Sequence, residues 1–188
     1  MGLKVYKADL NSSNFIALLD SDIRDTDNLI NELNSFISGS VNTLTGNAYD
    51  VAREEIESFI SILNQRKSTA NELKSAISNA MSSLSGYMGS YDYLDDSELE
   101  TLNNEINNIR ASYENIKEGY REGADNSLIK KVFLNKELTN IDKECSGLIA
   151  PLLDEIEKIK GLAGADASAY GCLSGVSTSS YMSAITGK

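Results

Sequence analysis

Histidine and tryptophan are absent from the 188-residue sequence, which also has only one proline and two cysteines. Without histidine, neither a Ser-His-Asp triad nor a Cys-His pair can be assembled. The carboxylate di-metal bundles that need Glu-x-x-His on their inner helix faces are excluded for the same reason. We therefore expect a non-enzymatic protein with no catalytic residues and no cofactor.

The two cysteines, Cys145 and Cys172, do not belong to a Cys-x-x-Cys pair, so neither a zinc site nor a thioredoxin-like site is expected. Cys145 falls in an apolar helical series and is interpreted as a small core residue. A Cys145–Cys172 bridge stays open, because the redox compartment is unknown. Asp92, Asp95 and Asp96 lack EF-hand spacing, and acids that precede a helix favour capping over a calcium site. No metal site is predicted.

Long basic and long apolar runs are also missing. The net charge is −11 and the longest basic cluster is Lys130-Lys131, so we do not expect nucleic acid as a partner. The longest apolar run, Leu148 to Leu153, is far shorter than the roughly 20 residues that span a bilayer. Residues Met1 to Lys7 lack the apolar segment of a signal peptide. We expect no stable membrane insertion and no use of the general secretory route.

The scarcity of proline permits long helices, and apolar residues recur every three or four positions over most of the chain. A first helix of about 30 residues is predicted to end at Ser38-Gly39-Ser40. A second helix of about 40 residues is predicted to follow Gly46 and to end at Gly86 or Gly89. No segment shows a convincing strand alternation. The apolar faces of the two helices, which form the core or bind a partner, are carried by Ile16, Leu19, Ile23, Ile30, Leu33, Ile56, Leu63, Leu73, Ile77 and Leu84.

Two further helices are predicted in the second half of the chain. Apolar residues from Leu99 to Tyr120 follow a strict three-four spacing, which favours a partner helix along the whole length. Residues 125–127 are predicted to open the last helix, in which Pro151 produces either a kink or a restart. The predicted fold class is all-α, an elongated long-helix hairpin or bundle with coiled-coil-like packing.

The composition changes near residue 160. Residues 1–160 are predicted to form the helical domain, and residues 161–188 a C-terminal tail or linker rich in Ser, Gly and Ala. A flexible linker is one interpretation of this tail. The other is a docked segment, because the tail also contains Leu173, Val176, Tyr181, Met182 and Ile185. The sequence does not decide between them.

The apolar stripe of the first helix is unusually wide, because Phe15, Leu18, Leu29 and Phe36 extend it. Such helices usually contact more than one neighbour. A hairpin of two helices leaves one flank exposed along its length. Either the last two helices cover this flank and close a bundle, or another protein covers it by helix-on-helix packing.

The turn Leu44-Thr45-Gly46 lies between the two long predicted helices. Gly46 permits a tight turn, Thr45 or Asn47 can cap the second helix, and Leu44 can pack on its first turn. Together with Met1-Gly-Leu-Lys-Val5 and the Ala48-Tyr49 helix opening, this arrangement resembles the LXG domain. That domain forms the N-terminal part of polymorphic toxins that Gram-positive bacteria export by the type VII secretion system. The resemblance covers nearly all of residues 1–160.

The resemblance implies a non-enzymatic targeting module for interbacterial antagonism. Such a module is made in the bacterial cytoplasm and secreted by the type VII route. It binds small helical partner or chaperone proteins, and this hetero-oligomer is presented to the secretion apparatus.

The chemistry of such toxins lies in a variable C-terminal domain, which this sequence does not contain. The chain is therefore either a targeting region or a stand-alone helical adaptor or chaperone of the same system. A structural coiled-coil protein or a helical pore is the alternative from another class, and the lack of an apolar hairpin of membrane length argues against the pore.

The resemblance also marks a candidate secretion signal. Partners in this system often carry Tyr-x-x-x-Asp/Glu after a helical hairpin, and Tyr91 and Asp95 have that spacing just after the second predicted helix. The spacing is common by chance, and in the family the partners supply the signal rather than the LXG domains.

Overall fold

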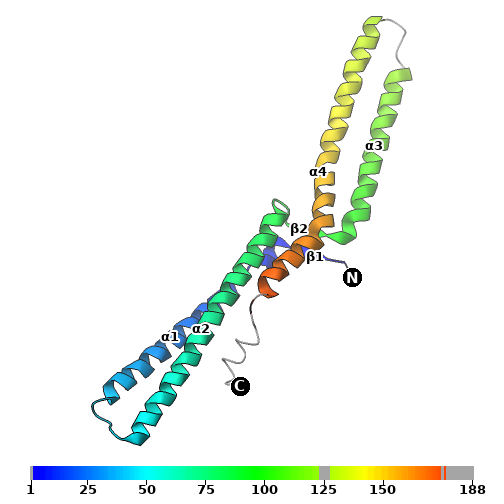
Figure 1. The fold of residues 1–188 in the computed structure, drawn as a ribbon. Coiled ribbons are helices and arrows are strands. Elements are labelled where there is room, and N and C mark those ends of the chain that lie inside the picture. The colour runs from blue at the N-terminus through cyan, green and yellow to red at the C-terminus, as the bar shows by residue number, and fades with distance from the viewer. Residues whose placement is uncertain (1, 123–127, 175, 177–188) are drawn as a thin grey trace. The chain divides into compact units, whose positions relative to one another are not determined.

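The computed structural model describes residues 2–122, 128–174 and 176. The predicted all-α fold class is confirmed, because helices hold most of these residues (Figure 1). In chain order the elements are β1 (Lys4–Tyr6), the 3-10 helix η1 (Lys7–Leu10), α1 (Ser13–Ser40), α2 (Asn47–Met88), β2 (Tyr93–Asp95), the 3-10 helix η2 (Asp96–Glu98), α3 (Leu99–Glu122) and α4 (Leu128–Ser174).

The chain divides into two compact units. Unit 1 consists of Met1–Asp9 and Tyr87–Gly164, and unit 2 consists of Leu10–Gly86 and Ala165–Lys188. All three boundaries lie inside helices, so η1, α2 and α4 each contribute residues to both units. The division into residues 1–160 and 161–188 stays a prediction.

Helix α4 continues beyond the point where the tail was predicted to begin. It runs through Gly161 to Ser174, and Leu162 and Ala169 are buried. Alanine is the best helix former, and the buried side chains add packing, so the flexible-linker interpretation is wrong for residues 161–174. Pro151 lies inside the helix, which therefore does not restart there. Tyr181, Met182, Ile185 and the predicted helix opening at 125–127 lie outside the described residues.

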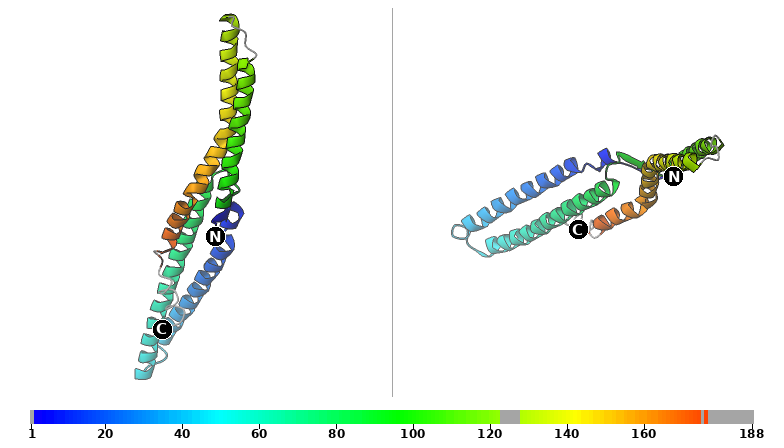
Figure 2. Two further views of the ribbon diagram at one scale, coloured as in Figure 1. Left: turned by 90° about the vertical axis from the view of Figure 1, so that its right-hand side faces the viewer. Right: turned by 90° about the horizontal axis from the view of Figure 1, so that it is seen from above.

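The main part of unit 2 is an antiparallel hairpin of α1 and α2, which lie side by side in both orientations of Figure 2. The buried residues of this hairpin include Leu19 and Ile30 of α1 and Leu63 of α2. Three ion pairs join the helices, and each takes an aspartate from α1 and a cation from α2: Asp20–Lys74 at 2.5 Å, Asp27–Lys67 at 2.5 Å, and Asp22–Arg66. Each pair joins one residue of α1 to one residue of α2, so the three pairs together fix the register of the two helices.

The last turns of α4 also belong to unit 2. Ala169 is buried together with Ala80 and Leu84 of α2. Leu10, Ala165 and Leu173 pack around these residues. The small side chains permit close approach of the helices, so this cluster is compact but contains little apolar volume.

Unit 1 contains the α3 and α4 pair. Leu102 and Ile106 of α3 and Ile156 and Ile159 of α4 are among its buried residues. The ammonium of Lys117 joins the helices, because it pairs with Asp142 of α4 at 2.5 Å as well as with Glu114 at 2.6 Å. Towards the far end of α3 the predicted heptad is only partly covered, since Ile116 and Tyr120 are nearly half exposed.

A short sheet in unit 1 corrects the expectation that the chain has no strands. β1 and β2 pair antiparallel, with Lys4 opposite Asp95 and Tyr6 opposite Tyr93. The backbone amide of Asp96 donates to the carbonyl of Leu3 at 3.1 Å and extends the pairing. Strands of three residues are too short to show an alternating pattern, so the sequence could not reveal them.

Candidate partner-binding surface

The ten residues of the predicted apolar faces all lie in unit 2, and none is exposed. Leu19, Ile30, Leu63 and Leu84 are buried. The other six are half-buried: Ile16, Ile23, Leu33, Ile56, Leu73 and Ile77. The sequence left open whether these faces form the core or bind a partner. Their burial fits a core, because side chains that are already covered within the chain offer little area to a partner.

A second apolar series on α1 stays exposed. It contains Phe15, Leu18, Leu29 and Phe36, of which Leu18 is the most open with 69% of its surface exposed. These residues follow one spacing of three and four residues along α1, in which Asp22, Asp25 and Glu32 fill the remaining positions. Positions with this spacing lie on one side of an α-helix.

A matching series lies on α2, where Val51, Phe59 and Ile62 are exposed. Arg66 follows Ile62 by one helical turn and pairs with Asp22, which belongs to the α1 series. The ion pair therefore places both series on the same side of the hairpin. We call this surface the outer face, defined by Phe15, Leu18, Leu29 and Phe36 of α1 and Val51, Phe59 and Ile62 of α2.

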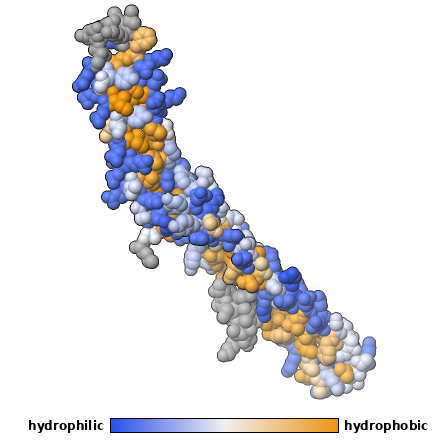
Figure 3. Space-filling view, turned by 180° about the vertical axis from the view of Figure 1, so that it is seen from behind, coloured by the Kyte–Doolittle hydropathy of each residue, from blue (hydrophilic) through white to orange (hydrophobic). Residues whose placement is uncertain are grey.

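Apolar surface gathers in bands between polar residues on the side of the molecule shown in Figure 3. Exposed large apolar residues are also found in unit 1, among them Leu148 and Leu153 of α4. Single exposed apolar residues are normal on protein surfaces. The outer face differs from these because its members repeat along two adjacent helices, which is the arrangement that packs against a further helix.

The turn between α1 and α2 contains the predicted Leu44-Thr45-Gly46 sequence. Gly46 has a φ of +119°, which side-chain-bearing residues rarely adopt. Its carbonyl accepts hydrogen bonds from the amides of Tyr49 at 2.9 Å and Asp50 at 3.2 Å, so Gly46 bonds the first turn of α2, which begins at the next residue. A Cβ atom at Gly46 would meet open space. The glycine is therefore required by the backbone angle rather than by a close approach of another segment.

Arg53 ties the turn to the first part of α2, a role that the sequence reasoning missed. Its guanidinium donates to the carbonyl of Leu44 at 3.0 Å and also pairs with Asp50. Leu44 itself is half-buried, whereas Thr45 is exposed. The i,i+3 spacing of Asp50 and Arg53 is the only signal in the sequence that points to this contact.

The structure does not bring the side chains of Tyr91 and Asp95 together. The hydroxyl of Tyr91 donates to the carboxylate of Asp154 in α4 at 2.8 Å, and partial burial together with this bond raises the pKa of Tyr91 to about 12. Asp95 instead pairs with Lys4 of β1 at 2.8 Å. Hydrogen bonds from Lys4 and Ser97 lower the pKa of Asp95 to about 2. Both residues thus have structural partners within unit 1, and their role as a secretion signal stays a prediction.

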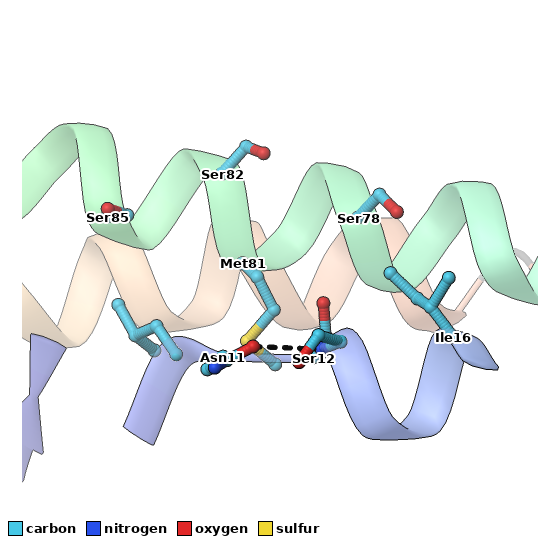
Figure 4. A pocket seen from close by; sticks show the side chains of 9 residues that line it. Asn11, Ser12, Ile16, Ser78, Met81, Ser82 and Ser85 are labelled. Atoms are coloured by element: carbon cyan, nitrogen blue, oxygen red, sulfur yellow. Dashed lines mark hydrogen bonds between the residues drawn. The ribbon is translucent and has the colours of Figure 1, made fainter. Parts of the chain in front are cut away.

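A shallow hollow in unit 2 lies between the start of α1 and the last part of α2 (Figure 4). Met81 extends from α2 towards Asn11 and Ser12, and Asn11 accepts a hydrogen bond from the amide of Ser13 at 3.0 Å. The other lining residues are Leu10, Ser13, Ile16, Ser78, Ser82 and Ser85. The lining includes no acid, base or thiol, so it offers no group that could activate a serine as a nucleophile.

Across the described ranges, 2–122, 128–174 and 176, no helix combines the length and the apolar character needed to cross a membrane. In the same part of the chain no three His, Cys, Asp or Glu residues are grouped so that they could hold a metal ion. Comparisons with protein-family models, with curated proteins and with solved structures found no match for this chain.

Proposed function

We propose that the chain is a non-enzymatic targeting region that binds helical partner proteins through its outer face. The observation that supports this is the pair of exposed apolar series on α1 and α2, joined by the Asp22–Arg66 pair. Several of these side chains are about half exposed or more, so a partner that covers them removes large apolar side chains from water.

The spacing of the outer face favours a helix as the partner. Leu18 and Phe36 are separated by five turns of α1, so a partner must be extended and straight to contact both. A helix with apolar residues every three or four positions has this shape and packs its own stripe into the groove between two helices.

The resemblance to the LXG domain supports a biological setting for this binding. The Leu44-Thr45-Gly46 turn, with Gly46 at positive φ, joins helices of 28 and 42 residues. We propose that the partners are small helical proteins, that the complex is exported by a type VII secretion system, and that any toxin chemistry resides outside residues 1–188. In this proposal the chain acts by binding alone.

Co-expression tests the binding step. The chain is produced with the small helical proteins encoded beside its gene, and the complex is followed by size-exclusion chromatography. We expect a stable complex, and we expect Leu18→Glu with Phe36→Glu to weaken it by about tenfold or more, because each charged side chain replaces apolar area that the partner would cover. The control is Leu148→Glu on α4, which starts from a similarly exposed leucine outside the outer face.

A cooperatively folded chain that forms no complex with any neighbour would contradict the binding proposal. Equal loss of binding in the Leu148→Glu control would show that the outer face has no special role. Export is tested separately by fusing a reporter after residue 188 in a bacterium with an active type VII system. We expect the reporter in the medium only when the system is intact, and less of it for the Leu18→Glu, Phe36→Glu variant.

A further inference from the structure

The α1 part of the outer face is not uniformly apolar. Along the three-four spacing the order is Phe15, Leu18, Asp22, Asp25, Leu29, Glu32 and Phe36. Asp22 is paired with Arg66, whereas Asp25 and Glu32 are exposed. On α2 the exposed Glu55 lies between Val51 and Phe59 at the same spacing. Any helix that covers the apolar residues from Leu18 to Phe36 therefore also covers Asp25 and Glu32.

A carboxylate that loses its water without gaining a cation costs several kcal/mol, so it would oppose docking of a purely apolar helix. A like charge on the partner would oppose docking further. A lysine or arginine opposite each acid removes both penalties, and it also steers the partner as it approaches.

The other side of α1 already shows this solution within the protein. There α2 contacts the apolar residues of α1, and Lys74 and Lys67 pair with Asp20 and Asp27. Helix α2 thus binds α1 with apolar residues flanked by cations. The outer side of α1 presents the same kind of surface, apolar residues alternating with acids, with its apolar residues uncovered.

We infer that the partner on the outer face is a helix of another protein with apolar residues at three-four spacing and lysine or arginine at the positions opposite Asp25 and Glu32. The inference rests on the proposed function, which supplies the docking helix, and it adds the chemistry by which that helix is selected. It predicts that the face discriminates between helices of equal apolar content by their charge.

Two synthetic helical peptides test this selection against the full chain. They share the same apolar residues and length and differ at two positions within the apolar stripe, which hold lysine in one peptide and glutamate in the other. We expect the chain to bind the lysine peptide at least about tenfold more tightly at low salt, measured by fluorescence anisotropy. The preference should shrink at about 1 M NaCl, where charges are screened within about 3 Å.

Charge reversal on the chain provides the matched variant. Asp25→Lys with Glu32→Lys should reverse the preference, so that the glutamate peptide binds more tightly. The control, Glu57→Lys with Glu72→Lys, makes the same change in net charge at exposed positions on α2 outside the outer-face series, and it should leave the preference for the lysine peptide in place.

Equal binding of the two peptides, or tighter binding of the glutamate peptide by the unaltered chain, would overturn the inference. Failure of both peptides to bind would also overturn it. Failure of the proposed function is recognised separately, by the loss of the co-expressed complex. Self-association of the chain that disappears in the Asp25→Lys, Glu32→Lys variant would identify a second copy as the occupant, and this too would overturn the inference.

Discussion

Each unit contains a pair of long helices, but the two pairs are held in different ways. In unit 1 the helices enclose branched aliphatic side chains such as Ile106 and Ile156, and the two-stranded sheet adds the fully buried Leu94. In unit 2 several buried positions of α2 are alanines, including Ala70 and Ala76, and three ion pairs join the helices. Buried apolar volume therefore dominates in unit 1, and polar pairing contributes more in unit 2.

The exposed apolar residues of the two units also differ. Unit 1 exposes Val132 and Phe133 of α4, whereas in unit 2 exposed phenylalanine and leucine side chains recur along α1 at the spacing of one helix face. Partly exposed ion pairs add at most about 1 kcal/mol each, so we expect unit 2 to be the less stable unit in the absence of a partner.

The largest expected effect comes from unit 1. Leu94→Ala removes a side chain with 0% exposure and leaves a cavity between the sheet and its surroundings. We expect a loss of about 2–4 kcal/mol in the free energy of unfolding. Urea denaturation gives the size, and hydrogen exchange read by mass spectrometry should show lost protection mainly in residues 87–164. Leu153→Ala, at an exposed position, should change little, and an equal loss there would contradict the assignment of the unit 1 core.

A smaller effect is expected at the α1–α2 turn. Gly46→Ala forces a side-chain-bearing residue to φ near +119°, which should destabilise the hairpin by about 1–3 kcal/mol. Gly39→Ala is the matched control, because Gly39 lies inside α1 and an added Cβ meets open space. We expect the control to be neutral or slightly stabilising. Equal hydrogen-exchange protection of unit 2 in the two variants would show that the turn angle is not required.

The Asp22–Arg66 pair should contribute about 1 kcal/mol to unit 2, since both side chains are less than one-third exposed. A double-mutant cycle with Asp22→Asn and Arg66→Gln measures this coupling in urea denaturation. The same cycle at about 1 M NaCl should give a smaller value, because the pair is partly screened. A coupling that does not change with salt would argue against an electrostatic origin.

The smallest change in stability is expected when low pH protonates Asp95 in the two-stranded sheet. The pKa of Asp95 is lowered from its ordinary value of 3.8 to about 2, so the Lys4–Asp95 pair stabilises the fold above about pH 4 and loses this contribution as the pH falls towards 2. Asp95→Asn should therefore be less stable than the unaltered chain at pH 7, and most of this difference should be gone near pH 2. Denaturation curves at both values check this, and a constant difference between them would contradict it.

The sequence predicted the helical framework well because the framework depends on local signals. Apolar spacing and the scarcity of proline located α1, α2 and α3, and the glycine at position 46 marked the turn. Local signals could not show that residues 161–174 extend α4, because Ser- and Gly-rich composition also occurs in linkers. They also could not show the sheet, whose strands are brought together from distant parts of the chain.

The candidate site was only partly predictable for a related reason. The spacing identified one wide apolar stripe on α1, but only the pairing of Asp22 with Arg66 shows which part of it faces outward together with α2. The ten residues predicted to form the apolar faces are the more regularly spaced ones, and regular spacing is strongest where a helix packs against its neighbour in the same chain. The less regular series, with Asp25 and Glu32 in its gaps, is the one that stays exposed.

The sheet of unit 1 has a consequence for the order in which the protein folds. The amide of Leu3 donates to the side chain of Asp96, a contact that spans 93 residues. Closing a loop of that length costs about 4 kcal/mol of chain entropy if the intervening residues are unfolded. Once α1 and α2 have paired, much of this cost has already been met. We therefore expect β1 to join β2 late in folding, after the helices that separate the two strands in the sequence have paired.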